Sequence, residues 1–243
     1  KNWLMAKASL KTIVTHCDRI LKTREFEDYK GAVNGLQVEN AGSVTRIAAA
    51  VDASMATVKM AVAAGAELLI VHHGLFWAPS HPWTGNRYQL MRLLLDNDLA
   101  VYSSHLPLDA HARLGNNVGL CAALGLKKLE PFFFDHGCHL GFQAGVKMTR
   151  DALGKNLAKV LGAEPTLLPG GPAQCRKIGV VTGGAGAELL VAAREGVDTF
   201  ITGEGPHHTF GMAEDVGINV FYGGHYATET FGVKALAAHL AKK

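Results

Sequence analysis

Short apolar runs alternate with amphipathic segments along most of the chain. The apolar runs predict buried strands, and the amphipathic segments carry apolar side chains at helical spacing. The expected strands are residues 46–51, 67–71 and 100–103. The expected helices are residues 55–64, 88–97 and 116–124. Strands that alternate with helices of about ten residues predict a largely parallel sheet covered by helices.

The second half of the chain repeats this order. Residues 177–205 align with residues 46–74 without a gap, from a basic residue through strand, small-residue turn and helix to the glycine that ends the helix. In this alignment His73 lies opposite Glu204. Residues 216–230 align in the same way with residues 96–110. Any two βα units share strands and helices, so the polar residues at the strand ends are the stronger sign of an internal duplication.

Polar side chains coincide where both aligned halves reach a strand end. His105 matches His225, and Asp109 matches Glu229. We therefore predict an α/β fold of two similar, pseudo-symmetric βα lobes with mainly parallel sheets covered by helices. The expected boundaries are 1–126 for the first lobe with an N-terminal helix, 127–176 for a connector and 177–243 for the second lobe. Together they are expected to form one compact metal-binding domain.

The composition narrows the class of protein. Hydrophobic residues make up 48% of the chain and charged residues 19%, which is typical of a globular domain and not of a disordered chain. The net charge of +3 is not gathered into a basic stripe, so we expect no specific nucleic-acid partner. No run approaches the ~18 apolar residues of a membrane span. The four cysteines are widely separated, which favours free thiols in the cytoplasm. Residues 1–21 predict an amphipathic helix and not a signal peptide.

Two adjacent histidines, His72 and His73, end the second apolar run and precede Gly74. Successive side chains of a strand point to opposite sides, so two ligands at these positions would hold different ions, as in a dinuclear centre. The alternative is one ligand with a hydrogen-bonded neighbour.

Two further His-x-x-x-carboxylate pairs follow later strands. His225 and Glu229 would share one face of a helix that starts after Gly224. His105 and Asp109 have the same spacing, but Pro107 disfavours a helix there and predicts a tight loop whose carboxylate returns towards the strand ends. Asp109 could instead cap a local turn.

Imidazole and carboxylate ligands together suit Zn, Fe, Mn, Ni or Co, and the lack of nearby cysteines argues against a sulfur-rich structural zinc site. One carboxylate can bridge two ions and leave positions for water, which is the arrangement of a catalytic centre.

Other clusters are weaker candidates. Residues 135–139 (DHGCH) include His136, Cys138 and His139, but they lie in the connector and are expected to face solvent or form a second site. Residues 182–186 form a glycine-rich turn that either receives a phosphate or serves packing. Glu204, with His207 and His208, is expected to line the same cavity as the first-lobe histidines. Trp77 and Trp83 are expected to order a loop over it.

Several of these motifs together resemble the bacterial YbgI-like family, whose members are named GTP cyclohydrolase 1 type 2 homologs. They are NGLQV (34–38), HHGLFW (72–77), SSHLPLDAHARLGNN (103–117), TGG (182–184), ITGE (201–204) and GHYATE (224–229). The resemblance runs from about residue 30 to the end. It implies two α/β lobes, a dinuclear metal centre between them and a toroidal homohexamer. The ligands it implies are His72, His73, Asp109, His225 and Glu229, with Glu229 as the bridge and His105 close by.

Two features depart from that family pattern. The chain lacks the large inserted domain of longer relatives, and it is richer in histidine after Glu204 than the pattern predicts.

The expected function is therefore a metal-dependent hydrolase with two divalent ions per chain and a nucleotide-like substrate. Water would attack an electron-poor carbon such as purine C8, with His105 or Glu204 as the proton shuttle. The alternative is a non-enzymatic metal chaperone or insertase that uses the same ligands. A third hypothesis is a scaffold ring whose metals only fix the lobes.

Overall fold

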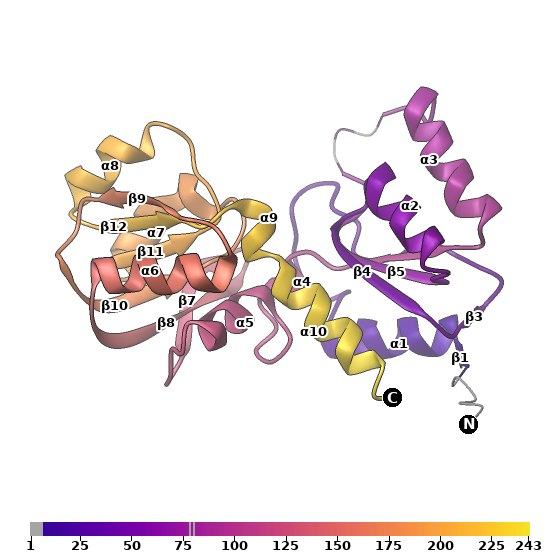
Figure 1. Ribbon diagram of the computed structural model, residues 1–243, viewed down its shortest axis with the longest axis horizontal. Coiled ribbons are helices and arrows are strands. Elements are labelled where there is room, and N and C mark those ends of the chain that lie inside the picture. Colours follow the sequence, from indigo (N-terminus) through magenta and orange to yellow (C-terminus); the bar gives the residue numbers. More distant parts are fainter. Residues whose placement is uncertain (1–6, 78, 80) are drawn as a thin grey trace. The chain divides into compact units, whose positions relative to one another are not determined.

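The computed structural model describes residues 7–77, 79 and 81–243 (Figure 1). Its internal contacts divide the chain into two compact units. Unit 1 comprises Lys1–Leu108 and Val233–Lys243, and unit 2 comprises Asp109–Gly232. The first six residues of the expected N-terminal helix lie outside the described residues, and the described part forms a helix from Leu10.

Unit 1 is built on a four-stranded sheet in the order β2-β6-β5-β4. The three strands expected from the apolar runs are β4, β5 and β6, and they pair in parallel. Strand β2 pairs antiparallel with β6 at one edge, and β1 with β3 forms a separate two-stranded ribbon. The strands are β1 (Ala8–Ser9), β2 (Gly35–Val38), β3 (Ser43–Val44), β4 (Ile47–Asp52), β5 (Leu68–His73) and β6 (Ala100–Ser103).

Helices cover both faces of this sheet, as Figure 1 shows for α2 and α3 on one side and α1 on the other. The helices are α1 (Leu10–Leu21), α2 (Met55–Ala63) and α3 (Gly85–Asp96). One core packs Val58 of α2 and Leu94 of α3 against Leu69 and Val71 of β5. Ser54 and Thr57 form a capping box that satisfies backbone donors at the start of α2. All of β5 except His73 is buried, because both of its faces are covered.

Two helices contain the positions at which the chain passes between the units. They are α4 (Leu106–Asp109) and α10 (Thr230–Leu240). The expectation of a tight loop around Pro107 is wrong, since the segment forms one helical turn. Pro107 is the second residue of α4, where a backbone N–H would have no partner inside the helix in any case.

Unit 2 contains a six-stranded sheet in the order β7-β8-β10-β11-β12-β9. Strands β10, β11 and β12 pair in parallel, and β7, β8 and β9 add antiparallel pairs at the two edges. This sheet is mixed because the segment 127–176, expected to be a connector, supplies those edge strands. The strands are β7 (Glu130–Asp135), β8 (Cys138–Thr149), β9 (Thr166–Pro169), β10 (Gln174–Val180), β11 (Thr199–Thr202) and β12 (Asn219–Tyr222).

Two apolar cores lie on the two faces of this sheet. Alternate residues of the central strands face opposite sides, so Ile201 and Phe221 join the core beneath α5 and α6. Phe200 and Val220 join the core beneath α7 and α8. The helices are α5 (Asn116–Ala123), α6 (Arg150–Leu161), the 3₁₀ turn η1 (Ala185–Glu188), α7 (Leu189–Arg194), α8 (Thr209–Val216) and α9 (His225–Thr228).

The expectation of an α/β protein is confirmed, with a sheet and covering helices in each unit. Among the residues that the structure describes, no helix is both long and apolar enough to cross a membrane.

Candidate functional site

Three histidines of unit 1 meet at the carboxyl ends of two adjacent parallel strands. Val71 of β5 is in register with Ser103 of β6. His73 lies two residues after Val71, and His105 lies two residues after Ser103. One ring nitrogen from each of His72, His73 and His105 lies within 4.8 Å of the others. The rings of His72 and His73 are 4.8 Å apart between centroids. The parallel pairing of β5 and β6 therefore assembles an imidazole cluster.

Each of these imidazoles is held at Nδ1 by an oxygen acceptor from a different part of the unit. Nδ1 of His72 lies 2.9 Å from the backbone oxygen of Ser104. Nδ1 of His73 lies 2.8 Å from Oδ1 of Asp52, its register partner on β4. Nδ1 of His105 lies 2.9 Å from Oδ1 of Asp28. Because all three acceptors are oxygens, each Nδ1 is the donor and each ring is fixed in orientation.

Asp28 is itself tightly held. Its Oδ2 accepts hydrogen bonds from Nδ2 of Asn34 at 2.7 Å and from the backbone N–H of Leu106 at 3.2 Å. Burial acts to raise the pKa of Asp28. The hydrogen bond and the charge of His105, together with hydrogen bonds from Asn34 and Tyr29, outweigh this effect and lower the pKa overall. Oδ1 of Asn34 also accepts from the backbone N–H of His105 at 2.7 Å. Asp28 and Asn34 thus fix both the backbone and the ring of His105.

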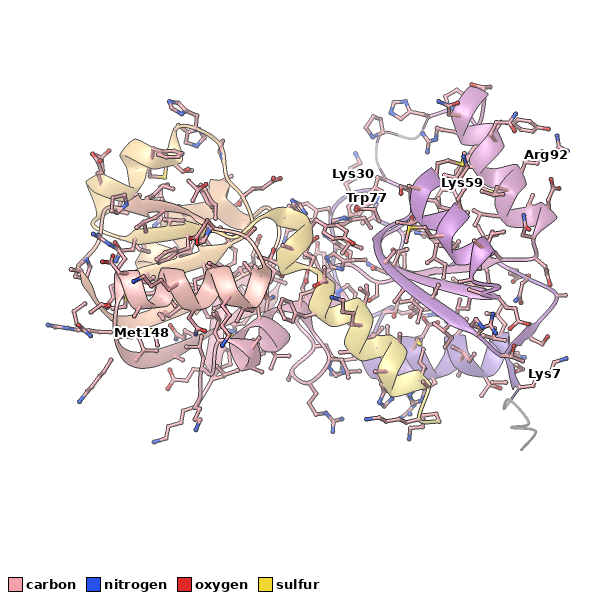
Figure 2. All side chains as sticks on the ribbon, in the orientation of Figure 1. Lys7, Lys30, Lys59, Trp77, Arg92 and Met148 are labelled. Atoms are coloured by element: carbon pink, nitrogen blue, oxygen red, sulfur yellow. The ribbon has the colours of Figure 1, made fainter. Side chains whose placement is uncertain are left out.

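Trp77, which Figure 2 labels, packs against two rings of the cluster. Its ring meets that of His105 edge-on at 4.9 Å and that of His73 at 5.9 Å. Nε1 of Trp77 donates to the backbone oxygen of Gly74. Trp83 instead packs against Phe76, so of the two tryptophans Trp77 is the one beside the histidines.

Unit 2 presents a second candidate set at the start of α9, which begins directly after Gly224, as the glycine pair predicts. Nε2 of His225 lies 3.2 Å from Oε2 of Glu229, and its Nδ1 lies 2.9 Å from Oε1 of Glu204. The hydrogen bond to Glu229 raises the pKa of His225 to about 9, against the effect of burial and with a further contribution from Glu204. Both ring nitrogens of His225 therefore face carboxylate oxygens, an arrangement that favours its protonated form.

Gly183 is required for Glu229 and His225 to lie where they do. Gly183 has a φ of +73°, and a Cβ at this position would collide with Oε1 of Glu229 and lie 3.5 Å from Nε2 of His225. Glu229 is only 2% exposed, so it has little room to withdraw. The glycine-rich turn after β10 thus brings backbone close to the carboxylate.

Asp109 lies beside the same turn. Its Oδ1 accepts from Nδ2 of Asn116 at 2.8 Å and from the hydroxyl of Thr182 at 3.4 Å. Asn117 supports this arrangement, because its Nδ2 donates to the backbone oxygen of Asp109 and its Oδ1 accepts from the N–H of Thr182 at 2.7 Å. Asp109 is 6% exposed and is thus a buried carboxylate held by neutral donors.

The weaker clusters lie at turns of unit 2. In the turn at 182–186, the N–H of Gly183 donates to the hydroxyl of Thr228, and the N–H of Gly186 donates to the backbone oxygen of Glu204. These two N–H groups are thus used within unit 2. His136, Cys138 and His139 lie around the β7–β8 hairpin turn. His207 and His208 are exposed just before α8.

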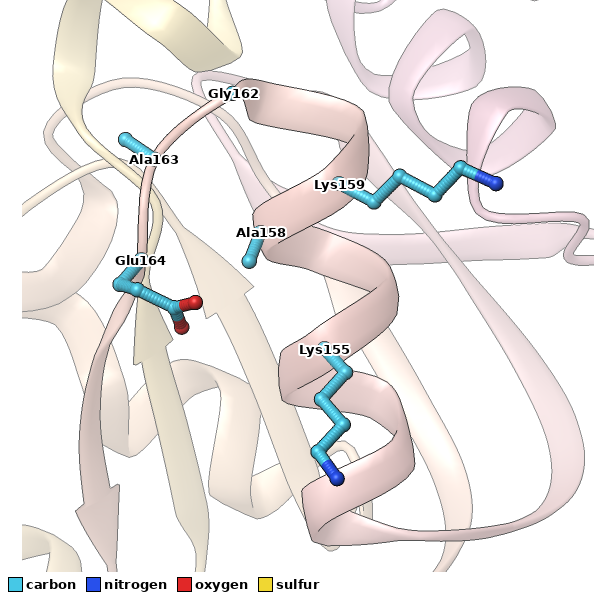
Figure 3. Close-up of a pocket in the computed structure, with 6 residues that line it drawn as sticks. All are labelled: Lys155, Ala158, Lys159, Gly162, Ala163 and Glu164. Carbon is cyan, nitrogen blue, oxygen red and sulfur yellow. The ribbon is translucent and has the colours of Figure 1, made fainter.

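A hollow of about 490 Å³ lies elsewhere in unit 2, at the C-terminal end of α6 (Figure 3). Its polar side chains are Lys155, Lys159 and Glu164. None of the candidate ligands lines it.

The donor sets fit divalent metal ions. In unit 1, Nδ1 of each of the three histidines is already hydrogen-bonded to an oxygen, so Nε2 is the nitrogen that can ligate an ion. This arrangement is common in metal-binding histidines. Unit 2 offers two buried carboxylates and an imidazole. The sequence identified His72, His73, His105, Asp109, His225, Glu229 and Glu204, but it missed the supporting residues Asp28, Asp52, Asn117 and Gly183. Local patterns contain no signal for Asp28 and Asp52, whereas Gly183 stands in the TGG motif and Asn117 ends the motif SSHLPLDAHARLGNN (103–117).

Comparison with known proteins agrees with the motifs. The family described as Duf34/NIF3 (NGG1p interacting factor 3) matches residues 8–243. A Halobacterium salinarum protein named GTP cyclohydrolase 1 type 2 homolog is 42% identical over 224 residues, covering 90% of this chain and 88% of that protein. The Pseudomonas aeruginosa protein of the same name is 38% identical over 239 residues, covering 97% and 93%.

Solved structures show the same fold. The protein ybgI, whose function is described as unknown, has a TM-score of 0.90 at 34% identity and covers 97% of this chain and 94% of its own. TTHA1606 from Thermus thermophilus has a TM-score of 0.89 at 35% identity with the same coverage. The resemblance to the YbgI-like proteins is confirmed, and the chain belongs to the Duf34/NIF3 family.

Proposed function

We propose that this protein binds two divalent metal ions per chain through His72, His73, Asp109, His225 and Glu229. The observation that carries the proposal is the Glu229–His225 pair. Glu229 is 2% exposed, and His225 beside it has a pKa raised to about 9. A buried carboxylate is costly without a cation, so in the metal-free state a proton on His225 supplies the positive charge. A dication would take over that role and release the proton.

The donors come from both units of the chain. Imidazoles dominate the set in unit 1, and carboxylates dominate the set in unit 2. We infer a dinuclear centre in which Glu229 is the bridging ligand. Oxygen and nitrogen donors of this kind accept Zn, Fe, Mn, Ni or Co.

We further propose that the protein is a hydrolase that acts on a nucleotide-like substrate. Support for the substrate class comes from the relatives named GTP cyclohydrolase 1 type 2 homolog. Bound divalent ions would polarise water or a substrate oxygen and stabilise developing negative charge. Of the two proton-shuttle candidates, His105 has a side chain 12% exposed, whereas that of Glu204 is 64% exposed and contacts Nδ1 of His225. Glu204 is therefore the group better placed to exchange a proton with solvent.

A metal chaperone or insertase is the second candidate function. It is favoured by the exposure of one proposed ligand, since the side chain of His225 is 34% exposed and that of its neighbour Glu204 is 64% exposed. Accessible donors allow an acceptor protein to approach the ion, which ligand exchange between two proteins requires.

The two functions separate in one set of measurements on protein purified without a histidine tag. Metal content is measured first in the wild type, in Glu229→Gln and in His239→Ala, a control histidine outside the candidate set. We expect two ions per chain, lost in the first variant and retained in the second. An equal content in wild type and Glu229→Gln refutes the metal site.

Function is then read from the metal-loaded protein. Turnover of a member of a nucleotide panel, abolished by Glu229→Gln, supports the hydrolase. Rapid transfer of metal to an apo-protein without turnover supports the chaperone. Slow metal release with neither activity supports ions that only fix the structure. Light scattering on the same samples tests the expected homohexamer.

A further inference from the structure

The function proposed above uses two of the three clustered imidazoles of unit 1. The third, His105, lies within the same 4.8 Å group and its ring centroid is 4.9 Å from that of His72. Its position and its hydrogen bonds indicate that His105 has a separate role.

We infer that His105 is a third imidazole ligand of a divalent ion bound by unit 1, and that Asp28 and Asp52 are positioning residues that fix His105 and His73 in the tautomer that presents Nε2 to the ion. This inference rests on the proposed metal binding. It assigns to His105 a role different from that of a proton shuttle.

The tautomer follows from the acceptors. A carboxylate oxygen and a backbone carbonyl oxygen can only accept hydrogen bonds, so Nδ1 of each ring carries the proton. The neutral ring then has its lone pair on Nε2, the atom a metal requires. The same logic holds separately for His72 on Ser104, His73 on Asp52 and His105 on Asp28. Three independent acceptors thus impose one tautomer on three neighbouring rings.

One ring nitrogen of each histidine lies within 4.8 Å of the others, a spacing that suits ligands of a common cation. Lone pairs of neutral imidazoles this close repel one another, and a bound dication turns that repulsion into coordination. A proton shuttle has a different requirement, because it must release its proton to solvent and recover it. The side chain of His105 is only 12% exposed and that of its partner Asp28 only 5%. The edge of Trp77 also packs against the ring of His105.

Asp28 is held by hydrogen bonds in a position from which it can fix the tautomer of the His105 ring. Its second oxygen accepts from two donors, Nδ2 of Asn34 and the backbone N–H of Leu106. Its Oδ1, which faces Nδ1 of His105, also accepts from the backbone N–H of Tyr29 at 2.7 Å. In Asp28→Asn only one oxygen remains to accept, and the NH₂ group takes the place of the other. The variant therefore cannot keep the partners of both oxygens, and the hold on the Nδ1–H tautomer of His105 is lost in part of the molecules.

The tautomer can be measured without any activity. In the metal-free protein labelled with ¹⁵N-histidine, two-bond ¹H–¹⁵N spectra distinguish Nδ1–H from Nε2–H rings. We expect His105 to be Nδ1–H in the wild type and to include Nε2–H rings in Asp28→Asn. Asp96→Asn is the matched control, since Asp96 pairs with Arg92 on the exposed surface of α3. An Nε2–H ring in the wild type overturns the inference.

Metal affinity supplies the second readout, measured by Zn²⁺ competition with a chromophoric chelator. Loss of an outer carboxylate that orients a ligating histidine weakens binding by about 10–100-fold. We expect a loss in that range for Asp28→Asn and Asp52→Asn, a loss at least as large for His105→Ala, and no change for the control His16→Ala.

The outcomes distinguish this inference from the proposed function. A wild type that binds no metal refutes the function. A wild type that binds metal no more tightly than His105→Ala and Asp28→Asn refutes only the role of His105. If His105→Ala fails to fold, the spectrum and the affinity of Asp28→Asn decide.

Discussion

Replacing Gly183 by alanine tests the packing of the unit 2 site. Gly183 has a φ of +73°, in the left-handed region, and a Cβ there would collide with Oε1 of Glu229. Gly217 is the matched control, because its φ is +71° and an added Cβ would meet no atom within 4 Å among the described residues. Both substitutions carry the same backbone strain, and only the first disturbs the candidate ligand.

The expected losses of stability follow from the backbone strain and from the collision with Glu229. Left-handed backbone costs an L-residue roughly 1–2 kcal/mol, and the reduced freedom of the unfolded chain offsets about 0.4–1 kcal/mol. Gly217→Ala should therefore lose about 1 kcal/mol, which is a fall in Tm of roughly 2–4 °C for a chain of this size. Overpacking against the buried Glu229 adds about 1–3 kcal/mol in Gly183→Ala. The Tm of that variant should fall by roughly 5–10 °C.

Both variants are compared in the metal-free state by calorimetry and then with Zn²⁺ by competition titration. Gly183→Ala should be the less stable protein and should also bind metal more weakly, whereas Gly217→Ala should bind metal like the wild type. Equal Tm values and equal affinities for the two variants would refute the close approach of Gly183 to Glu229.

Three further predictions follow from buried or charged groups. In the metal-free protein, an NMR titration should give His225 a pKa of about 9, and Glu229→Gln should lower this pKa. The stability that the proton on His225 confers is fully present below pH 6.5. It is lost as the pH rises through about 9. Metal affinity should correspondingly increase with pH through that range, and a flat profile would contradict displacement of the proton. Burial raises the pKa of Cys17 to about 12, so a thiol reagent should modify Cys138, the least buried cysteine, long before Cys17 under native conditions. Asn117→Ala should destabilise the protein by about 2–4 kcal/mol in urea unfolding, because it leaves buried backbone donors and acceptors without partners; a loss below about 1 kcal/mol would show that water replaces the amide.

The order of local elements could be predicted from the sequence because it depends on neighbouring residues. The apolar run at 46–51 forms β4 (Ile47–Asp52), and the helical pattern at 55–64 forms α2 (Met55–Ala63). The glycine pair before His225 predicts where α9 begins. The expected loop at Pro107 was wrong because proline breaks the interior of a helix but is accepted in its first turn.

The segment 127–176 shows where local patterns are insufficient. Its residues form strands β7, β8 and β9, and whether such strands join a sheet depends on partners far along the chain. The alignment between 46–74 and 177–205 concerns only parallel strands, so it contains no information on the antiparallel edges that make the second sheet mixed.

The sequence by itself determined the candidate ligand types and their places at strand and helix ends. Hydrophobic periodicity fixes where strands stop, and the polar residues that follow neighbouring strands then lie along the same edge of the sheet. Only the tertiary structure decided what holds those ligands. Asp28 is 77 residues from His105, and Asp52 is 21 residues from His73. The proton positions that make these imidazoles suitable for metal depend on such distant oxygens, which come together only when the strands pair.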